Sequence, residues 1–354
     1  MRKSNFELLR IISMFLILMS HCDDIFGLAN LYSAGLGTNK LITDWLHAGG
    51  QIGVGCFLLI SGYFMVEKTV TIKKMLRLAG EVWFYSIGIW VVWAAYKFCN
   101  SGFDKTVITE AIYAFFPITF SHYWFVTAYV ILMVLSPYFN KLIWVMSKEE
   151  YKKFLTCLLV IFVVIQGGIP YALTGMSEGR ILPVFLFYFI AGYLKRFRTE
   201  KTTEVKKHMT NAIMLYIFLI ASFYVITLIG IKLDSTTIVG LRYFYRVLNS
   251  PIVVIICIEL FLAMSEMNID SSVIVNEIAG CTFGVYLLHQ NRLLGTYLYK
   301  IFPIYKETRS LYIFVYSIIS VVSIYLVCTV IDFIRKKTVE RWWFIYLDKH
   351  VGDK

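Results

Sequence analysis

Arg10 and His21 are two polar side chains in the first apolar run of the chain, residues 6–22. An α-helix turns about 100° and rises about 1.5 Å per residue, so eleven positions bring both side chains to nearly the same face, about 16 Å apart along the axis. A guanidinium binds anions such as phosphate, and a neutral imidazole accepts a proton as a general base. The spacing predicts a helix face with an anion-binding group at one end and a proton acceptor at the other.

That face is costly to expose to lipid. On insertion scales, Arg at the middle of a membrane helix costs about 2.5 to 3.5 kcal/mol, so we expect Arg10 and His21 to face a protein interior or a watery cavity. Two plainer interpretations stay open. Arg10 pairs with Glu7 one turn back and extends to the inner interface, and His21 is an inert hydrogen-bonded residue at the outer helix end.

The distance between the two side chains suggests a ligand. A coenzyme A thioester carries phosphates at one end and its reactive carbonyl at the far end of a pantetheine arm of comparable length. Arg10 would hold phosphate from the cytoplasmic side. His21 would then lie where the acyl group arrives and could take a proton from an attacking hydroxyl.

A second basic group, Lys73, Lys74 and Arg77, follows the second apolar run. Lys74 and Arg77, at positions i and i+3 of a helix, share a face and could bind the same anionic ligand. Basic residues at a cytoplasmic helix end are also expected for topology and for anionic lipid alone. Both interpretations stay open.

Other polar or small residues lie within later apolar runs. His289 and Glu259 are ionisable groups at membrane depth and are predicted to contact substrate, with a structural hydrogen bond as the alternative. Trp124 begins the fourth run and is either a substrate contact or a residue of the interfacial aromatic belt. The glycine-rich segment 49–55 has no preceding strand, so close helix packing explains it better than dinucleotide binding.

Composition defines the class of protein. The 354 residues are 58% hydrophobic and only 16% charged, which predicts an all-α polytopic membrane protein. The net charge of +11 is expected from the positive-inside rule, and no nucleic-acid motif accompanies it, so no nucleic-acid partner is expected. The seven cysteines are isolated from one another, which indicates neither disulfides nor a metal site.

Hydrophobic windows of about 20 residues predict ten spans and, with both termini cytoplasmic, place most of the Lys and Arg residues on the inner side. The first span has no cleavage site, so we expect it to be retained. A polar loop, Asp23–Ala48, is expected outside, and residues 336–354 are predicted to form a cytoplasmic amphipathic tail after a membrane domain of residues 1–335. The predicted spans are 6–24, 49–66, 79–97, 122–144, 154–171, 181–197, 209–231, 246–266, 277–299 and 310–334.

Four segments in this order resemble one family. The run from Glu7 to His21, with its R-x10-H spacing, is similar to the signature of the acyltransferase 3 family of bacterial integral-membrane O-acyltransferases. Residues 54–64 resemble its FF-x-ISG-F/Y segment, residues 124–126 its WFL segment, and residues 286–290 its late YLxH segment.

The resemblance implies a ten-helix enzyme of the cell membrane. Such an enzyme takes an acyl group, usually acetyl from cytoplasmic acetyl-CoA, and places it on a sugar hydroxyl of a surface polysaccharide or its lipid-linked precursor. His21 then corresponds to the catalytic histidine and Arg10 to its arginine partner. The family's R-x-x-R element corresponds to Lys74 and Arg77, where lysine keeps the charge and loses the bidentate geometry. The proline that often follows this element is absent.

Two other classes of function fit the same features. A transporter or flippase for a glycan intermediate would also need many spans and embedded ionisable residues. A sensor or ligand-binding membrane module is the third possibility. A transporter would release no thiol from acetyl-CoA.

Overall fold

The computed structural model describes residues 4–21, 38–120, 122–168, 181–198, 204–241, 247–302 and 312–352. All regular structure in these ranges is helical, which confirms the predicted all-α class. The elements, two of them π-helical (η), are α1 (Ser4–Ser20), α3 (Thr38–Met65), α4 (Ile72–Ser101), α5 (Lys105–Phe115), α6 (Trp124–Val145), α7 (Lys148–Leu158), η2 (Leu159–Gln166), α9 (Leu182–Phe197), α10 (Val205–Lys232), α11 (Thr236–Gly240), α12 (Pro251–Glu266), α13 (Val273–Gly280), α14 (Thr282–His289), α15 (Arg292–Ile301), α16 (Tyr312–Arg335), η5 (Lys336–Glu340) and α17 (Arg341–His350).

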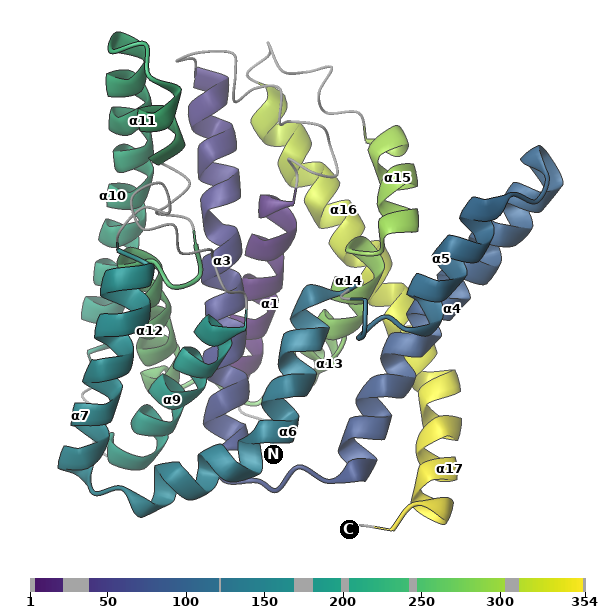
Figure 1. The fold of residues 1–354 in the computed structure, drawn as a ribbon, viewed down its shortest axis with the longest axis horizontal. Coiled ribbons are helices and arrows are strands. Elements are labelled where there is room, and N and C mark those ends of the chain that lie inside the picture. Colours follow the sequence, from purple (N-terminus) through teal and green to yellow (C-terminus); the bar gives the residue numbers. More distant parts are fainter. Residues whose placement is uncertain are drawn as a thin grey trace.

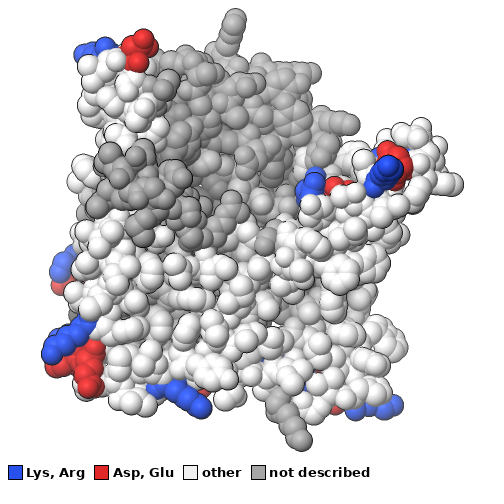
Figure 2. Space-filling view, viewed as in Figure 1, with Lys and Arg blue, Asp and Glu red and all other residues white. Residues whose placement is uncertain are grey.

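Within these ranges, five helical stretches are long and apolar enough to cross a membrane. Figure 2 shows a broad uncharged surface across the middle of one face, with most charged side chains nearer its edges. This pattern agrees with a chain whose central band lies in lipid. The count of ten spans and the cytoplasmic side of the termini remain predictions. The five stretches are Ile42–Met65, Ile72–Ser101, Trp124–Val145, Val205–Lys232 and Tyr312–His350.

The short helix α1 lies beside the longer α3 near the middle of the molecule (Figure 1). Glycines of α3 make this approach possible. A Cβ atom at Gly53 would collide with the carbonyl oxygen of Ser13 and lie 2.9 Å from Ile17 Cγ1, and one at Gly50 would collide with the Ser20 hydroxyl. The prediction of close helix packing at this segment is confirmed.

Helix α3 begins earlier than the sequence predicted. The expected loop Asp23–Ala48 is wrong over 38–48, which forms the first turns of α3, while 22–37 lies outside the described residues. Ile42 and Leu46 lie one turn apart and both pack into the core. An amphipathic start of this kind has too many polar residues for a hydropathy window to detect.

The predicted ninth span, 277–299, is wrong as a single helix. It is divided into α13, α14 and α15. The Thr282 hydroxyl bonds the Ala279 carbonyl at 2.8 Å where α13 ends. Asn291 caps the start of α15, because its Oδ1 accepts the backbone N–H groups of Leu293 and Leu294 at 3.0 and 3.4 Å. These breaks leave α14 as a separate short segment.

Ionic and hydrogen-bonding contacts hold α4 against α16, and α14 packs closely on the same part of α16. Arg335 Nε donates to Asp332 Oδ1 at 2.7 Å, and its Nη2 donates to Glu81 Oε1 of α4 at 2.9 Å. The Tyr85 hydroxyl donates to Asp332 Oδ1 at 2.6 Å. A Cβ atom at Gly284 of α14 would overlap the Asp332 side chain, so only glycine fits there.

The predicted tail continues the last long helix. After α16 the chain passes through η5 into α17 without a loop (Figure 1). The segment packs on α4, where Trp343 Nε1 donates to the Leu76 carbonyl at 3.3 Å and the indole fills the space that a side chain at Gly80 would need. Residues 353–354 lie outside the described residues.

The close contact between Gly53 of α3 and Ser13 of α1 leads to a prediction about stability. We expect Gly53→Ala to lower the unfolding midpoint of the purified protein, because the backbone of Ser13 cannot yield to the added methyl. Overpacking of this kind costs about 1 to 3 kcal/mol. Gly88→Ala in α4 is the matched control, since nothing lies within 4 Å of its added Cβ. Equal midpoints for the two variants, measured by thermal unfolding in detergent, would contradict the close approach of α1 and α3.

Candidate active site

A cavity of about 320 Å³ lies between α1, α3, α4, α6, α13 and α14. Its volume falls in the range of about 300 to 1,000 Å³ that small-molecule sites occupy. All four sequence segments that carry the resemblance contribute to its wall. The lining residues are Arg10, Met14, Ile17, Ser20, His21, Gly50, Gln51, Val54, Phe57, Ser61, Leu78, Trp124, Phe125, Tyr129, Ala279, Gly280, Thr282, Phe283 and Tyr286.

Arg10 lines this cavity as the helix geometry predicts. It also makes the predicted ion pair with Glu7, whose two carboxylate oxygens lie 2.9 and 3.1 Å from Arg10 Nη1. Both bonds use one nitrogen, whereas a guanidinium carries donors on three. The Arg10 side chain is 25% exposed, while that of Glu7 is 6% exposed. Arg10 therefore neutralises a buried carboxylate and still presents a surface to the cavity.

His21, directly after α1, lines the same cavity. Its Nδ1 lies 3.1 Å from Nε2 of His289, the last residue of α14. The Gln290 side-chain amide lies 2.7 Å from the same Nδ1. His289 is 1% exposed and bonds the Val285 carbonyl through its Nδ1 at 2.7 Å. The structure thus joins the two predicted histidines directly.

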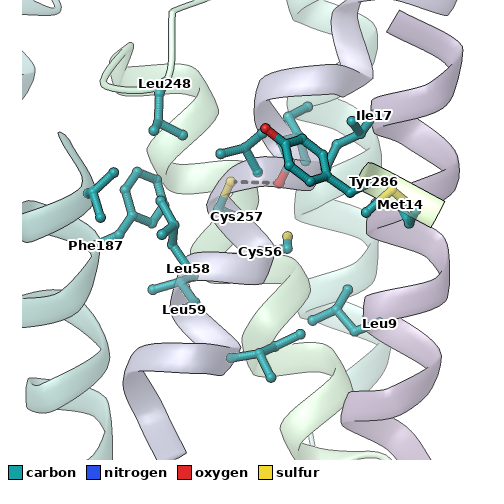
Figure 3. Packing of buried hydrophobic residues seen from close by; sticks show 14 of the residues in the cluster. Leu9, Met14, Ile17, Cys56, Leu58, Leu59, Phe187, Leu248, Cys257 and Tyr286 are labelled. Carbon is teal, nitrogen blue, oxygen red and sulfur yellow. Dashed lines mark hydrogen bonds between the residues drawn. The ribbon is translucent and has the colours of Figure 1, made fainter. Parts of the chain in front are cut away.

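An aromatic wall completes the cavity. Trp124 is the first residue of α6, and Phe125 stacks on Tyr129 one turn later with ring centroids 6.0 Å apart. Tyr286 of α14 meets Phe125 edge-on at 5.7 Å. In Figure 3, Tyr286 lies beside Met14 and Ile17 of α1, which line the same cavity. Trp124 therefore lines the cavity, where a substrate could contact it.

The predicted phosphate ligands Lys74 and Arg77 are not among the lining residues, although Leu78 is. Lys74 Nζ donates to the Thr69 carbonyl at 2.8 Å and is exposed. Arg77 Nη2 contacts Asp348 Oδ1 of α17 at 2.8 Å, and its guanidinium lies 4.3 Å from the ring centre of Phe344. Both basic residues therefore lie on α4 close to Leu78, which lines the cavity. Arg77 is already paired with a carboxylate of the same chain, that of Asp348.

Glu259, predicted to contact substrate, is also not among the lining residues. Its Oε2 lies 2.6 Å from His208 Nδ1, and His208 Nε2 lies 3.9 Å from Glu266 Oε1. Arg198 pairs with the same Glu266. This placement supports the structural alternative for Glu259, a group hydrogen-bonded to His208 that joins α12 to α10.

Sequence reasoning left out of the site two residues that line the cavity, Tyr129 and Thr282, and one that contacts His21, Gln290. Tyr129 follows Phe125 by one helical turn, and this i, i+4 spacing could have placed both on one face. Gln290 directly follows His289 in the late motif. Thr282 gave no signal, because it enters the site only through the break between α13 and α14.

The fold and the cavity define a class of protein: a helical membrane protein with a mostly apolar cavity whose wall includes a histidine and an arginine. The chain belongs to the acyltransferase 3 family, since the family's acyltransferase domain profile matches residues 3–331. The resemblance to this family is therefore confirmed, and the family indicates a membrane acyltransferase. Searches of curated proteins and of solved structures found no match.

The Arg10–Glu7 pair makes a second stability prediction. Arg10→Met leaves the Glu7 carboxylate buried without its partner, which typically costs about 3 to 5 kcal/mol. The double variant Glu7→Gln/Arg10→Met removes that uncompensated charge, so it should regain most of the lost stability. Thermal unfolding of the three proteins measures this directly. A double variant no more stable than Arg10→Met would show that the carboxylate is not what Arg10 neutralises.

Proposed function

We propose that this protein is an O-acetyltransferase of the cell membrane, which moves an acetyl group from cytoplasmic acetyl-CoA to a hydroxyl of a cell-surface polysaccharide or its lipid-linked precursor. One observation carries the proposal: Arg10 of α1 and His21, the residue directly after α1, line one cavity. Their axial separation of about 16 Å suits a ligand with phosphates at one end and a thioester at the other.

The donor would lie along α1. Arg10 supplies a guanidinium at the inner part of the cavity, and phosphate oxygens bind such a group through charge-assisted hydrogen bonds. Lys74 and Arg77 lie on the first turns of α4, whose Leu78 lines the cavity, so we assign them to the nucleotide phosphates outside the wall. Asp348 then competes with those phosphates for Arg77.

The acceptor would reach His21 from the other end. In a direct transfer, the acceptor oxygen forms a bond to the acetyl carbon while its proton moves to His21. The bond between that carbon and the sulfur of coenzyme A breaks, and the thiolate takes the proton from His21. An acetyl ester and free coenzyme A result. We assign Trp124 to contact with the substrate, because it lies on the cavity wall beside Phe125.

The proposal predicts a histidine-dependent release of thiol. Purified protein mixed with acetyl-CoA and glycan acceptors should produce free coenzyme A, followed with a thiol reagent. His21→Ala should lower the rate at least about 100-fold, since general-base catalysis contributes about 10² to 10⁴. His350→Ala is the control, because His350 is exposed on α17 and bonds only the Tyr346 carbonyl among the described residues. A transporter would release no thiol, and equal rates for His21→Ala and wild type would reject the chemistry.

The role of Arg10 predicts a separate effect on the donor. The single variant Arg10→Met is expected to be destabilised, which would obscure an effect on binding. The test therefore compares the double variant Glu7→Gln/Arg10→Met with Glu7→Gln alone. We expect the double variant to raise the KM for acetyl-CoA at least about tenfold, because a hydrogen bond to a charged group contributes about 1.5 to 3 kcal/mol. The KM for the acceptor should change less. If both KM values match those of Glu7→Gln, Arg10 only neutralises Glu7 and does not bind phosphate.

A further inference from the structure

His289 lies behind His21 as seen from the cavity. The cavity wall includes His21 but not His289, which is only 1% exposed. The two rings come from α14 and the end of α1, with centroids 5.3 Å apart and planes inclined by 34°. His289 was predicted to contact substrate, whereas its position gives it contact with another histidine.

The hydrogen positions follow from the partners. The Val285 carbonyl can only accept, so the 2.7 Å contact requires a hydrogen on His289 Nδ1. A neutral imidazole has one N–H, so His289 Nε2 carries a lone pair. The hydrogen in the 3.1 Å contact between the rings must then be on His21 Nδ1. This leaves a lone pair on His21 Nε2.

Gln290 fits the same assignment once its side-chain amide is turned. The amide nitrogen Nε2, a donor, is the atom that lies 2.7 Å from His21 Nδ1. A side-chain amide has an oxygen acceptor as well as N–H donors, and a half-turn of the amide places Oε1 toward Nδ1. Both His289 and Gln290 can therefore accept from an N–H at this position.

The turn between α14 and α15 holds these two acceptors in place. Asn291 Nδ2 donates to the Tyr123 hydroxyl at 2.8 Å, and its Oδ1 caps α15. His289 is itself held by a carbonyl of its own helix, four residues earlier. The turn thus fixes the position of the His289 ring relative to His21.

We infer that His289 is a positioning residue that keeps His21 in the Nδ1–H tautomer, with the lone pair of Nε2 available as the base. The inference rests on the proposed function. When Nε2 takes the acceptor's proton, His21 becomes an imidazolium and its hydrogen bond to His289 becomes charge-assisted, and therefore stronger. His289 neither receives that proton nor touches the substrate. The proton leaves His21 with the coenzyme A thiolate.

The kinetic test compares His289→Leu with His289→Gln in the full-length protein. Leucine removes the acceptor, whereas the glutamine amide oxygen can replace it. We expect His289→Leu to lower kcat about 10- to 100-fold, as loss of a supporting partner typically does, with both KM values within about twofold of wild type. His289→Gln should recover most of the rate. A rise in the acceptor KM at constant kcat, or no rescue by glutamine, would overturn the positioning role.

A second measurement does not depend on turnover. Nitrogen-15 NMR of histidine-labelled protein separates protonated from unprotonated ring nitrogens, and the His21 signals are those absent from His21→Ala. Wild type should show N–H at Nδ1 of His21, and His289→Leu should shift the population toward the other tautomer. An N–H at Nε2 in wild type would overturn the inference. The expected tautomer without His21-dependent thiol release would instead overturn the proposed function.

Discussion

The constraint that shapes this molecule is the cost of exposing a cation and an imidazole to lipid. The face of α1 that carries Arg10 must be kept away from lipid. Glycine residues of α3 let that helix pack closely on the neighbouring face of α1, at Ser13, Ile17 and Ser20. Packing to the level of backbone contact then fixes the orientation of α1. The polar face is left to form one wall of a cavity rather than to contact lipid.

The part of the cavity wall formed by α13 and α14 depends on interruptions of the helix predicted over residues 277–299. An unbroken ninth span would have carried its polar residues along one straight helix. Instead the helix is interrupted at Cys281 and again at Gln290. The short helix α14 between these interruptions packs against α16, where Gly284 contacts Asp332. The second interruption places His289 and Gln290 beside His21. His289, which lies 268 positions after His21 in the sequence, thus contacts the Nδ1 atom of His21.

How much of this the sequence predicts depends on how local each feature is. The shared face of Arg10 and His21 follows from helix periodicity alone. The cost of exposing them to lipid predicts that this face turns toward a protein interior or a watery cavity. The contact between His21 and His289 depends on how distant helices pack, and no periodicity encodes it. Hydropathy windows average over single polar residues, so they miss the break at Gln290. They also miss the early start of α3 at Thr38.

The basic residues after α3 illustrate the same limit. Spacing places Lys74 and Arg77 on one helix face, but it does not show that Asp348 from the far end of the chain reaches Arg77. The acidic partner lies on α17, which continues α16 as a helix and packs on α4. Local charge patterns therefore indicate where an anion can bind, while tertiary packing decides which anion is there.

The most direct test of the central claim is an experimental structure of the protein with a non-reactive thioether analogue of acetyl-CoA. We expect the analogue to lie along α1, with its acyl carbonyl within hydrogen-bonding reach of His21 and its phosphates toward Arg10 and the start of α4. An analogue bound elsewhere, or packed side chains separating Arg10 from His21, would contradict the account.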